Sequence, residues 1–546
     1  MDNNFVLGID FGTSTTLVAL PGESPKVIPI GVTFPWIPSV LASRDGKDWI
    51  VGEEAEVADV RDQIRSPKTS ITFNQTDPLK TDRGIEIDPD VAIETILKIV
   101  KEKCRESGLS TLGLVRMSCP AIWTGTNRLR LATIANKVGF NIDVDHIMDE
   151  PIAAAISWWW NKTRQGFGAI ENCKAVIFDL GGGTLDVAIV DIYSANNRPE
   201  ITVMSARGTR EAGDKLDDLL AERIELELHE QHGYVVESQA NPGELRAWIR
   251  REAKAVKERL SESRETEFQI KELSNEIPSI VVTRLQLEEV FTPQLKRLMA
   301  CTEDALREAK MKLLSADNNA IMREDISVIG KEVDFVVLAG GMSQIPIIST
   351  ELQKRMPNAI IEYAISRERA TEAIVEGVSN LGEFANLNVH RPSFDFVMTW
   401  KTSDGMEHEQ IVFPAFTSLY DSYQISIGMS ELGREIPFKP PTDPVGKCKL
   451  IVRSVGGKPV SFKINGSHNN YIPLEANRHL GIHMKLYMDG RLYIRDALGF
   501  EIKSRIREWP VVRWGTTGRK DTSLIMENTV WQAPSMPTQH WELNLD

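Results

Sequence analysis

The segment VIFDLGGGTLDVA, residues 176–188, is the strongest indication of the fold, because it repeats the residue pattern of LGIDFGTSTTLVA at residues 7–19. Each segment has an apolar strand that ends in Asp, a turn rich in Gly and Thr, and a second apolar strand. This order predicts a β-hairpin whose turn depends on glycine for its backbone angles. Two related hairpins far apart in one chain predict a duplicated fold with one site between the two halves.

The residues of the two turns suit the phosphates of a nucleoside triphosphate. Glycines let main-chain N–H groups come close to an anion, because they carry no side chain. We expect one turn on each side of the phosphates, with these residues in contact: Gly12, Thr13, Ser14 and Thr15 from the first, and Gly181, Gly182, Gly183 and Thr184 from the second. The chain has no GxxxxGK[ST] motif, so we do not expect a P-loop site.

Three aspartates stand beside these turns. Asp10 and Asp179 end their strands there, a position that suits Mg²⁺ held through water, and Asp186 lies on the second strand of the second hairpin. A further apolar strand at 334–339 runs into Gly340-Gly341, where the backbone can pass close to a flat base or ribose. The plainer interpretation, two ordinary hairpins with glycine in their turns, does not account for this third element.

The rest of the chain is mixed α/β up to about residue 385 and β-rich beyond it. Apolar spacing predicts helices at 91–104, 127–138, 150–160 and 370–381 and a buried strand at 114–120. Residues 241–244, NPGE, predict a capped start for a helix in a charged helical block. After residue 386, alternating residues predict strands at 423–429 and 460–464, and Asp489-Gly490 predicts a hairpin turn. Of the three consecutive tryptophans at 158–160, we expect two to be buried and one to lie at a domain contact or a partner surface.

These motifs resemble those of a known superfamily. GIDFGTSTT and FDLGGGTLDVAIVDI resemble the two phosphate motifs of the Hsp70/actin/sugar-kinase superfamily, the second in the form closest to Hsp70s. VVLAGGMSQIPII resembles the Hsp70 adenosine motif, and MDEPIAAAISW resembles the first connecting helix. The resemblance covers residues 5–380 in family order. It implies an α/β fold: a two-lobed actin-like ATPase, built as a duplicated ribonuclease H-like fold, followed by a β-rich C-terminal domain.

The resemblance also implies the boundaries of the domains. We predict an Hsp70-like nucleotide-binding domain at 1–385, with a helical insertion at about 212–330. We predict a β-rich C-terminal domain at 386–546, without the acidic Leu-rich linker and helical lid that are usual in Hsp70s. Two interpretations of this domain stay open: a substrate-binding domain that takes up peptide as an added strand, or a different β-domain fused to an Hsp70-like ATPase.

Roles for individual residues follow from the same resemblance. Asp10, Lys68, Glu150, Asp179 and Asp186 would form the catalytic centre, with Asp10 and Asp179 holding Mg²⁺ through water. A surface position is the alternative for Lys68, because the residues around it differ from the family pattern. The nucleotide would also contact Gly213, Asp214, Lys257, Ser261, Gly340, Gly341, Met342 and Gln344. Gln344 stands where the family has an arginine that stacks on adenine, so we expect weaker ATP binding.

Composition limits the partners and the compartment. A formal net charge of −14 argues against nucleic-acid or anionic-membrane partners, which need a basic face. Five scattered cysteines without CxxC spacing predict neither a disulfide framework nor a zinc site. The start MDNNFVLGIDFG lacks the basic and apolar segments of a signal peptide, and no apolar run is long enough to span a membrane, so we expect a cytoplasmic protein.

The function that we expect is an Hsp70-like ATP hydrolase with ATP and Mg²⁺ as cofactors. It would bind ATP or ADP between the lobes and couple hydrolysis to the binding and release of unfolded polypeptide or a protein client, together with co-chaperones. Two alternatives stay open at this point. One is an actin-like filament-forming or regulatory ATPase without chaperone activity, and the other is a small-molecule kinase of the same superfamily.

Overall fold

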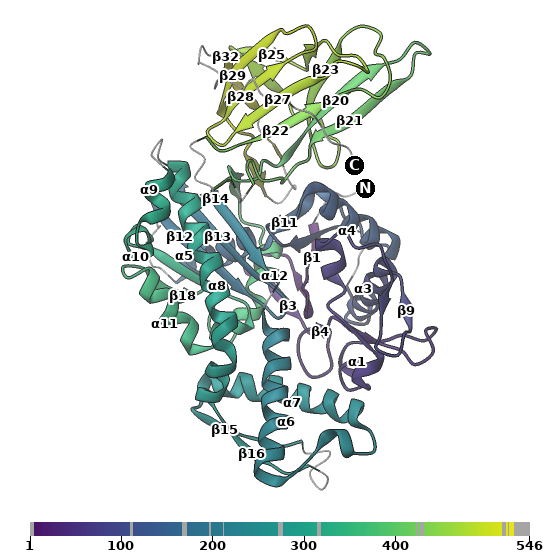
Figure 1. The fold of residues 1–546 in the computed structure, drawn as a ribbon, viewed down its shortest axis with the longest axis vertical. Helices are drawn as coiled ribbons and strands as arrows, with labels where there is room; N and C mark the ends of the chain where they lie inside the picture. The colour runs from purple at the N-terminus through teal and green to yellow at the C-terminus, as the bar shows by residue number, and fades with distance from the viewer. Residues whose placement is uncertain are drawn as a thin grey trace. The chain divides into compact units, whose positions relative to one another are not determined.

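The computed structural model describes residues 5–109, 113–165, 172–195, 198–210, 212–270, 277–313, 318–421, 424–425, 431–515, 520–521 and 523–528. The chain divides into two compact units (Figure 1). The first holds Met1–His390 and Val511–Lys520, and the second holds Arg391–Pro510 and Asp521–Asp546. The first unit gives way to the second after His390, close to the predicted boundary after residue 385. Residues 511–520, which we predict within the β-rich domain, group instead with the first unit, because a strand in this segment pairs there.

The first unit contains the same sheet twice, which confirms the duplicated fold. One sheet has the strand order β11-β10-β1-β2-β3, and the other contains the order β18-β17-β12-β13-β14. In both, the first three strands run parallel and the last three run antiparallel. The strands are β1 (Phe5–Phe11), β2 (Thr15–Leu20), β3 (Lys26–Ile28), β10 (Leu114–Cys119), β11 (Ile147–Asp149), β12 (Asn172–Leu180), β13 (Leu185–Ala195), β14 (Arg198–Thr209), β17 (Phe335–Ala339) and β18 (Ile360–Tyr363). We call the half built on the first sheet lobe I and the half built on the second lobe II.

Two helices cross between the lobes. α5 (Glu150–Arg164) follows β11 of lobe I but packs on β12, β13 and β17 of lobe II. α12 (Ala373–Ser379) follows β18 of lobe II but packs on β1, β2 and β10 of lobe I. The two helices touch at Gly377, where a Cβ atom would lie 1.9 Å from the carbonyl oxygen of Ala153. Glycine therefore permits the close crossing through which the lobes are joined.

The other predicted helices of the first unit are present. Asp88 caps α3 (Pro89–Glu106) by accepting bonds from the N–H groups of Asp90 and Val91. α4 (Gly125–Val138) covers the predicted helix at 127–138. Trp158 and Trp159 of α5 are buried and Trp160 is partly buried against the core, so two of the three tryptophans lie in the core as expected.

The predicted helical block is a bundle with one small hairpin (Figure 1). It consists of α6 (Gly213–His232), α7 (Pro242–Glu262), β15 (Glu265–Phe268), β16 (Ile280–Thr283), α8 (Arg284–Leu313), α9 (Asn318–Arg323) and α10 (Ile326–Gly330). Pro242 is the first residue of α7 as predicted, but the predicted capping bond is wrong. Asn241 has φ −129° and ψ 68°, outside the extended conformation usual at this position, and its side chain makes no capping bond.

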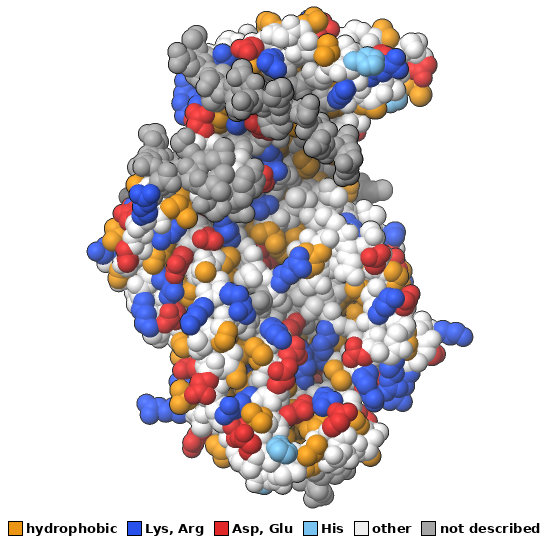
Figure 2. Space-filling model, in the orientation of Figure 1, with side chains coloured by type: hydrophobic (Ala, Val, Ile, Leu, Met, Phe, Trp, Pro, Cys, Tyr) orange, Lys and Arg blue, Asp and Glu red, His pale blue; other side chains and the backbone are white. Residues whose placement is uncertain are grey.

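Shorter elements complete the first unit. They are β4 (Ile37–Pro38), β5 (Val40–Ala42), β6 (Ile50–Val51), α1 (Glu53–Glu56), β7 (Gln63–Arg65), α2 (Lys68–Thr72), β8 (Leu79–Lys80), β9 (Glu86–Ile87), α11 (Pro346–Arg355), β19 (Phe384–Asn388) and β30 (Val512–Trp514). Basic and acidic side chains are interspersed over the face shown in Figure 2. Among the described residues, no helix combines the length and the apolar character needed to cross a membrane.

The second unit is β-rich, as predicted. One sheet has the order β21-β20-β23-β26 and the other β22-β27-β28-β29-β32-β24-β25. Its strands are β20 (Phe394–Lys401), β21 (Glu407–Phe413), β22 (Gly433–Phe438), β23 (Cys448–Ser454), β24 (Phe462–Ile464), β25 (Ser467–Asn469), β26 (Ile472–Leu474), β27 (Ile482–Tyr487), β28 (Arg491–Arg495), β29 (Glu501–Glu508) and β32 (Leu524–Asn528), with β31 (Lys520–Asp521) at the division.

Two of the predicted β features of this unit are confirmed. β27 and β28 form the hairpin predicted at Asp489-Gly490, where Gly490 has φ 84°. β24 lies within the strand predicted at 460–464. Most of the strand predicted at 423–429, including Tyr423, Ile427 and Met429, lies outside the described residues.

Candidate functional site

A pocket of about 450 Å³ lies between the two hairpin turns of the first unit. The size is within the range of small-molecule sites. Every predicted site residue except Asp186 and Gly213 lines it: Asp10, Gly12, Thr13, Ser14, Thr15, Lys68, Glu150, Asp179, Gly181, Gly182, Gly183, Thr184, Asp214, Lys257, Ser261, Gly340, Gly341, Met342 and Gln344. Asp186 is buried beside the pocket, and Gly213 packs on Gly181, whose carbonyl accepts its N–H.

The two glycine turns meet across the pocket. A Cβ atom on Gly182 would lie 2.0 Å from the Ser14 hydroxyl, and one on Gly183 would lie 2.1 Å from a methyl carbon of Thr13. Each turn is closed by a backbone bond, from Gly12 N–H to Thr15 O and from Gly181 N–H to Thr184 O. Side chains on these glycines would therefore push the hairpins apart, so the sequence of the turns determines how closely two backbones can approach one ligand.

Buried carboxyl groups gather at the base of this pocket. Asp10, Glu150, Asp179 and Asp186 are each less than a tenth exposed. Burial, then the charge of Glu150, raises the pKa of Asp10 to about 6 and that of Asp186 to about 7, and both causes raise the pKa of Asp179 well above its usual range. A cation bound among these buried carboxyl groups would favour their ionised forms and bring their pKa values down again.

Lys68 is the cation placed among these carboxyl groups. Its Nζ lies 2.7 Å from Glu150 Oε1, and both side chains are buried. Burial alone would lower the pKa of Lys68, but the charges of Glu150 and Asp10 outweigh it, so its pKa is raised. The ammonium also lies 5.5 Å from the centre of the Trp123 ring. Lys68 therefore lies inside the pocket rather than on the surface.

The carboxyl cluster suits Mg²⁺ held through water and phosphate oxygens. Among the described residues, no three His, Cys, Asp or Glu side chains are arranged to bind a metal ion directly. Mg²⁺ in nucleotide sites keeps several waters and uses one or two carboxylates together with the phosphates. An oxygen of Asp186 is buried without a hydrogen-bond partner, so the cluster has unused acceptor capacity as well as excess negative charge. The residues thus fit a hydrated divalent cation.

Asp214 of α6 ties the two lobes together above the phosphate turns. One of its carboxylate oxygens accepts bonds from the hydroxyls of Ser14, at 2.8 Å, and Ser66, at 3.0 Å. Burial would raise the pKa of Asp214, but Arg250 and the Ser14 hydroxyl bring it below its usual range, so the carboxylate stays charged. Because Ser14 and Asp214 both line the pocket, this bond joins α6 to lobe I across one side of it.

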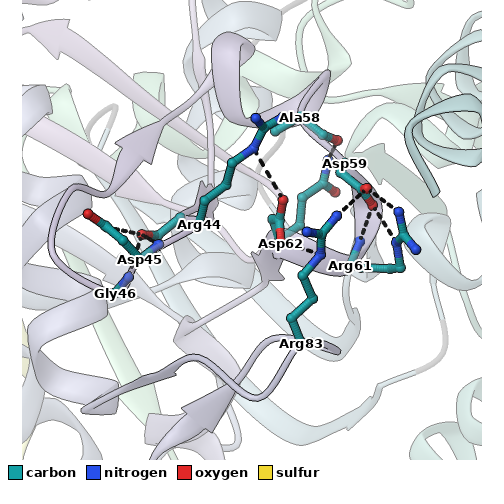
Figure 3. Close-up of polar contacts among 10 residues, drawn as sticks. Arg44, Asp45, Gly46, Ala58, Asp59, Arg61, Asp62 and Arg83 are labelled. Atoms are coloured by element: carbon teal, nitrogen blue, oxygen red, sulfur yellow. Dashed lines mark hydrogen bonds and ion pairs between the residues drawn. The ribbon is translucent and has the colours of Figure 1, made fainter. Parts of the chain in front are cut away.

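An ionic cluster in lobe I, drawn in Figure 3, makes a second contact with the helical block. Asp59 accepts bonds from Arg61 and Arg83, and these bonds, chiefly that from Arg61, lower its pKa to about 2. Asp62 pairs with Arg83 at 2.9 Å, while Arg44 approaches it at 3.6 Å.

This cluster is in contact with the helical block. A Cβ atom on Gly243, in the first turn of α7, would lie 2.4 Å from both Asp59 Oδ1 and Arg61 Nε. Lys254, also on α7, lies 3.5 Å from Glu56. The helical block and lobe I are therefore in contact beside the pocket.

The other end of the pocket is built from α7 and the Gly340-Gly341 turn. Lys257, Ser261 and Gln344 line it as predicted. Gly340 has φ 76°, and a Cβ there would lie 2.3 Å from Leu180 O, so only glycine fits the turn. Lys257 is held by Asp217 at 2.5 Å. Residues that the sequence did not single out also line this end or the entrance: Trp36, Asp217, Lys254, Glu258, Arg259, Glu262, Ile345, Glu368, Thr371 and Ile374.

Two serines, Ser118 and Ser39, hold residues of the pocket in place, and no local sequence pattern predicts them. The Ser118 hydroxyl donates to Asp10 at 2.6 Å, because β10 lies parallel beside β1. The Ser39 hydroxyl donates to Gly12 O at 3.0 Å, and the Ser39 N–H donates to Ser14 O. These contacts join residues far apart in the chain, so no spacing rule could have found them.

Comparisons with known proteins agree with this geometry. The family model described as Hsp70 protein matches residues 78–415. The Chaperone protein DnaK of Mycoplasmoides gallisepticum is 25% identical over 394 residues, which cover 69% of this chain and 60% of the relative. The Chaperone protein DnaK of Thermosipho melanesiensis is 26% identical over 382 residues, which cover 68% of this chain and 59% of the relative. The match thus spans about three fifths of the length of these curated relatives. Because the family model covers more than half of the chain, this protein belongs to the Hsp70 family.

Proposed function

We propose that this protein is an ATP hydrolase that binds Mg–ATP between its two lobes and uses hydrolysis to control the binding and release of polypeptide. The observation that carries the proposal is the pocket in which two glycine turns meet above a buried cluster of four carboxyl groups and one lysine. Family membership supports the ATPase, and the DnaK relatives are named as chaperones.

The residues of the pocket would have four roles. The backbone of the turns at Gly12–Thr15 and Gly181–Thr184 would hold the phosphates, and Asp10 and Asp179 would hold Mg²⁺ through water. The metal would neutralise charge on the phosphates when bound. Lys68 places a fixed positive charge in a water-poor site, where it can stabilise the charge that develops on the transferring phosphoryl group. Glu150 orients Lys68 through their ion pair and can position the attacking water.

Nucleotide binding would be coupled to the lobes through the contacts that close the pocket. Asp214 joins α6 to Ser14 and Ser66, and Lys254 of α7 lies near Glu56. Both turns would contact the terminal phosphate. When hydrolysis removes this phosphate, the lobes lose their common ligand and can rotate about the crossing of α5 and α12. The β-rich second unit would respond to that rotation, and an unfolded polypeptide would be its substrate. Co-chaperones would act on the same cycle.

Phosphate release by the full chain tests the proposal. We expect ATP hydrolysis that an unfolded polypeptide stimulates, and we expect Asp179→Asn to abolish both the basal and the stimulated rates. Transfer of phosphate to a sugar would instead indicate a small-molecule kinase. Sedimentation of polymer in the presence of ATP would indicate a filament-forming ATPase. Hydrolysis that polypeptide never stimulates would contradict the chaperone part of the proposal and leave a regulatory ATPase.

A further inference from the structure

A strand from the far end of the chain lies in the sheet of lobe II. β19 follows α12, pairs in parallel with β14 and is paired on its other edge, antiparallel, with β30. The register joins Phe384 to Trp514, Ala385 to Arg513 and Asn386 to Val512. We call residues 511–515 the return strand, because the chain reaches them only after passing through residues 391–510 of the second unit.

Trp514 anchors the return strand to lobe II. Its ring stacks on Phe384, with centroids 5.9 Å apart and planes 14° apart. Its indole N–H donates to Asn386 Oδ1 at 2.6 Å. Trp514 and Val512 are 5% and 3% exposed and belong to the same core as the buried tryptophans of α5. Trp514 and Val512 thus supply the buried apolar contact of a strand three residues long.

The same tryptophan and its neighbour also contact lobe I. Arg116 of β10 is fully buried and donates from Nη2 to the carbonyl of Gly515 at 2.8 Å and from Nη1 to Asn380 O at 3.2 Å. Its guanidinium lies 5.4 Å from the centre of the Trp514 ring. His146, which precedes β11, meets that ring edge-on at 6.3 Å. The return strand therefore depends on both lobes, lobe II through backbone pairing and lobe I through Arg116 and His146.

These two sets of contacts cannot both survive a rotation of one lobe against the other. Strand pairing fixes the return strand to lobe II within tenths of an ångström, while the Arg116 bond fixes it to lobe I with the same tolerance. The strand is also short, so the burial of one tryptophan opposes the ordering entropy of about five residues. Because the gain from burial and the loss of chain entropy are of similar size, the docked and released forms of the strand are close in free energy, as a switch requires.

We propose that the edge of β19, together with Arg116 and His146, is a docking site for a β-strand that carries an aromatic residue. The return strand of this chain occupies the site, and Mg–ATP binding releases it by rotating the lobes. The inference rests on the proposed function, because it needs a nucleotide-driven rotation. Release would free the segment at which the chain returns to the first unit, since the chain crosses between the units after residues 390, 510 and 520.

Hydrogen exchange on the full chain tests the release. We expect amides at 511–515 to exchange at least tenfold faster with Mg²⁺ and a non-hydrolysable ATP analogue than without nucleotide. Amides at 12–15 and 181–184 should become protected in the same samples. Protection of the turns without any change at 511–515 would overturn the docking switch and leave the proposed function intact. No protection of the turns and no phosphate release would contradict the proposed function instead.

An engineered disulfide between β19 and β30 tests whether release of the return strand is needed for the faster exchange. Ala385 and Arg513 are paired residues of antiparallel strands, whose Cα atoms are close enough for a disulfide. In the double variant A385C/R513C we expect the oxidised chain to lose the nucleotide-dependent exchange at 511–515 and the reduced chain to regain it. Equal nucleotide responses in the oxidised and reduced chains would contradict the proposal.

A peptide added in trans tests the groove itself. Trp514→Ala should expose amides at 384–388, and a synthetic peptide of residues 509–515 should restore their protection, whereas the peptide with Ala in place of Trp514 should not. Trp509→Ala is the control, because Trp509 stacks on Phe394 within the second unit. Should Trp514→Ala not fold, the wild-type chain with Mg²⁺ and the analogue provides the open groove. Failure of the peptide to protect residues 384–388 in either sample would overturn the docking site.

Discussion

Lys68 Nζ lies 2.7 Å from Glu150 Oε1, and the two side chains are only 2% and 8% exposed, although 82 positions separate them in the chain. The pair joins the first residue of α2 to the first residue of α5, at the base of the pocket. A buried pair of this kind contributes little net stability while both partners are present, but removal of one leaves the other charged and buried. Its position therefore makes it sensitive to single substitutions.

Lys68→Ala should lower turnover by about a hundredfold or more and change nucleotide affinity by less than about threefold, because a fixed charge that acts on the transition state changes kcat more than binding. It should also destabilise the fold by about 3–5 kcal/mol, because Glu150 loses its partner. Steady-state kinetics and urea unfolding measure the two effects. Lys80→Ala is the control, since Lys80 also pairs at 2.7 Å, with Glu86, but is 61% exposed. A change in affinity with unaltered kcat would assign Lys68 to ground-state binding.

Asp10→Asn and Asp179→Asn should each reduce phosphate release sharply while the protein stays folded. Both carboxyl groups lose a charge that would hold the hydrated cation, but both amides keep the size of the side chain. Circular dichroism should be unaltered, and the thermal midpoint of the nucleotide-free protein should rise, because unfavourable buried charge is removed. Normal turnover in both variants would contradict the assignment of the site.

The nucleotide-free protein should lose stability as the pH rises from about 5 to about 8. The folded state raises the pKa of Asp10 to about 6 and that of Asp186 to about 7, so it binds more protons than the unfolded chain in this window, and stability falls with pH. Each unit of pKa difference corresponds to about 1.4 kcal/mol. Thermal melts across this range should show the slope, and Asp186→Asn should reduce it.

Asp77→Asn, on the surface, should leave that slope unaltered. Saturation with Mg²⁺ and nucleotide should weaken the pH dependence, because a bound cation favours the ionised carboxylates. A thermal midpoint that instead rises with pH over the same window would contradict the arrangement of charges at the site.

Asp214→Ala should speed the release of bound nucleotide by about tenfold, because it removes a charged acceptor that holds Ser14 and Ser66 across the mouth of the pocket. Stopped-flow displacement of a fluorescent nucleotide measures the rate. Asp82→Ala, at an exposed position, serves as the comparison. If the release rate is the same in both variants, the closure does not depend on Asp214.

Gln344→Arg should tighten ATP binding. Gln344 lines the end of the pocket where we place the base, and an arginine there could stack on it with a gain of about 0.5–2 kcal/mol, which corresponds to about 2–30-fold in Kd. Calorimetric titration of the wild type and the variant with ATP provides the comparison. An unaltered Kd would indicate that the base lies elsewhere in the pocket.

Most of the residues that line the pocket could be predicted from local patterns. The two hairpins, the Gly340 turn and the start of α5 each carry their signal in consecutive residues, because turn geometry and strand alternation depend on near neighbours. Asn241 shows the limit of predictions from local patterns. The residue stands at the start of α7 as predicted, but its backbone angles differ from those usual at a capping position, and its side chain makes no capping bond.

The duplicated sheets and the glycine turns could be predicted from the sequence, because they depend on short-range steric preferences and on the spacing of apolar residues. Three features became visible only in the folded molecule: Lys68 is buried against Glu150, the Ser118 hydroxyl donates to Asp10, and the return strand pairs within the sheet of lobe II. Each of these depends on contacts between segments distant in the chain. A three-residue strand such as β30 has too little local preference to form alone, so its place is set by the partner edge and the buried pocket for Trp514.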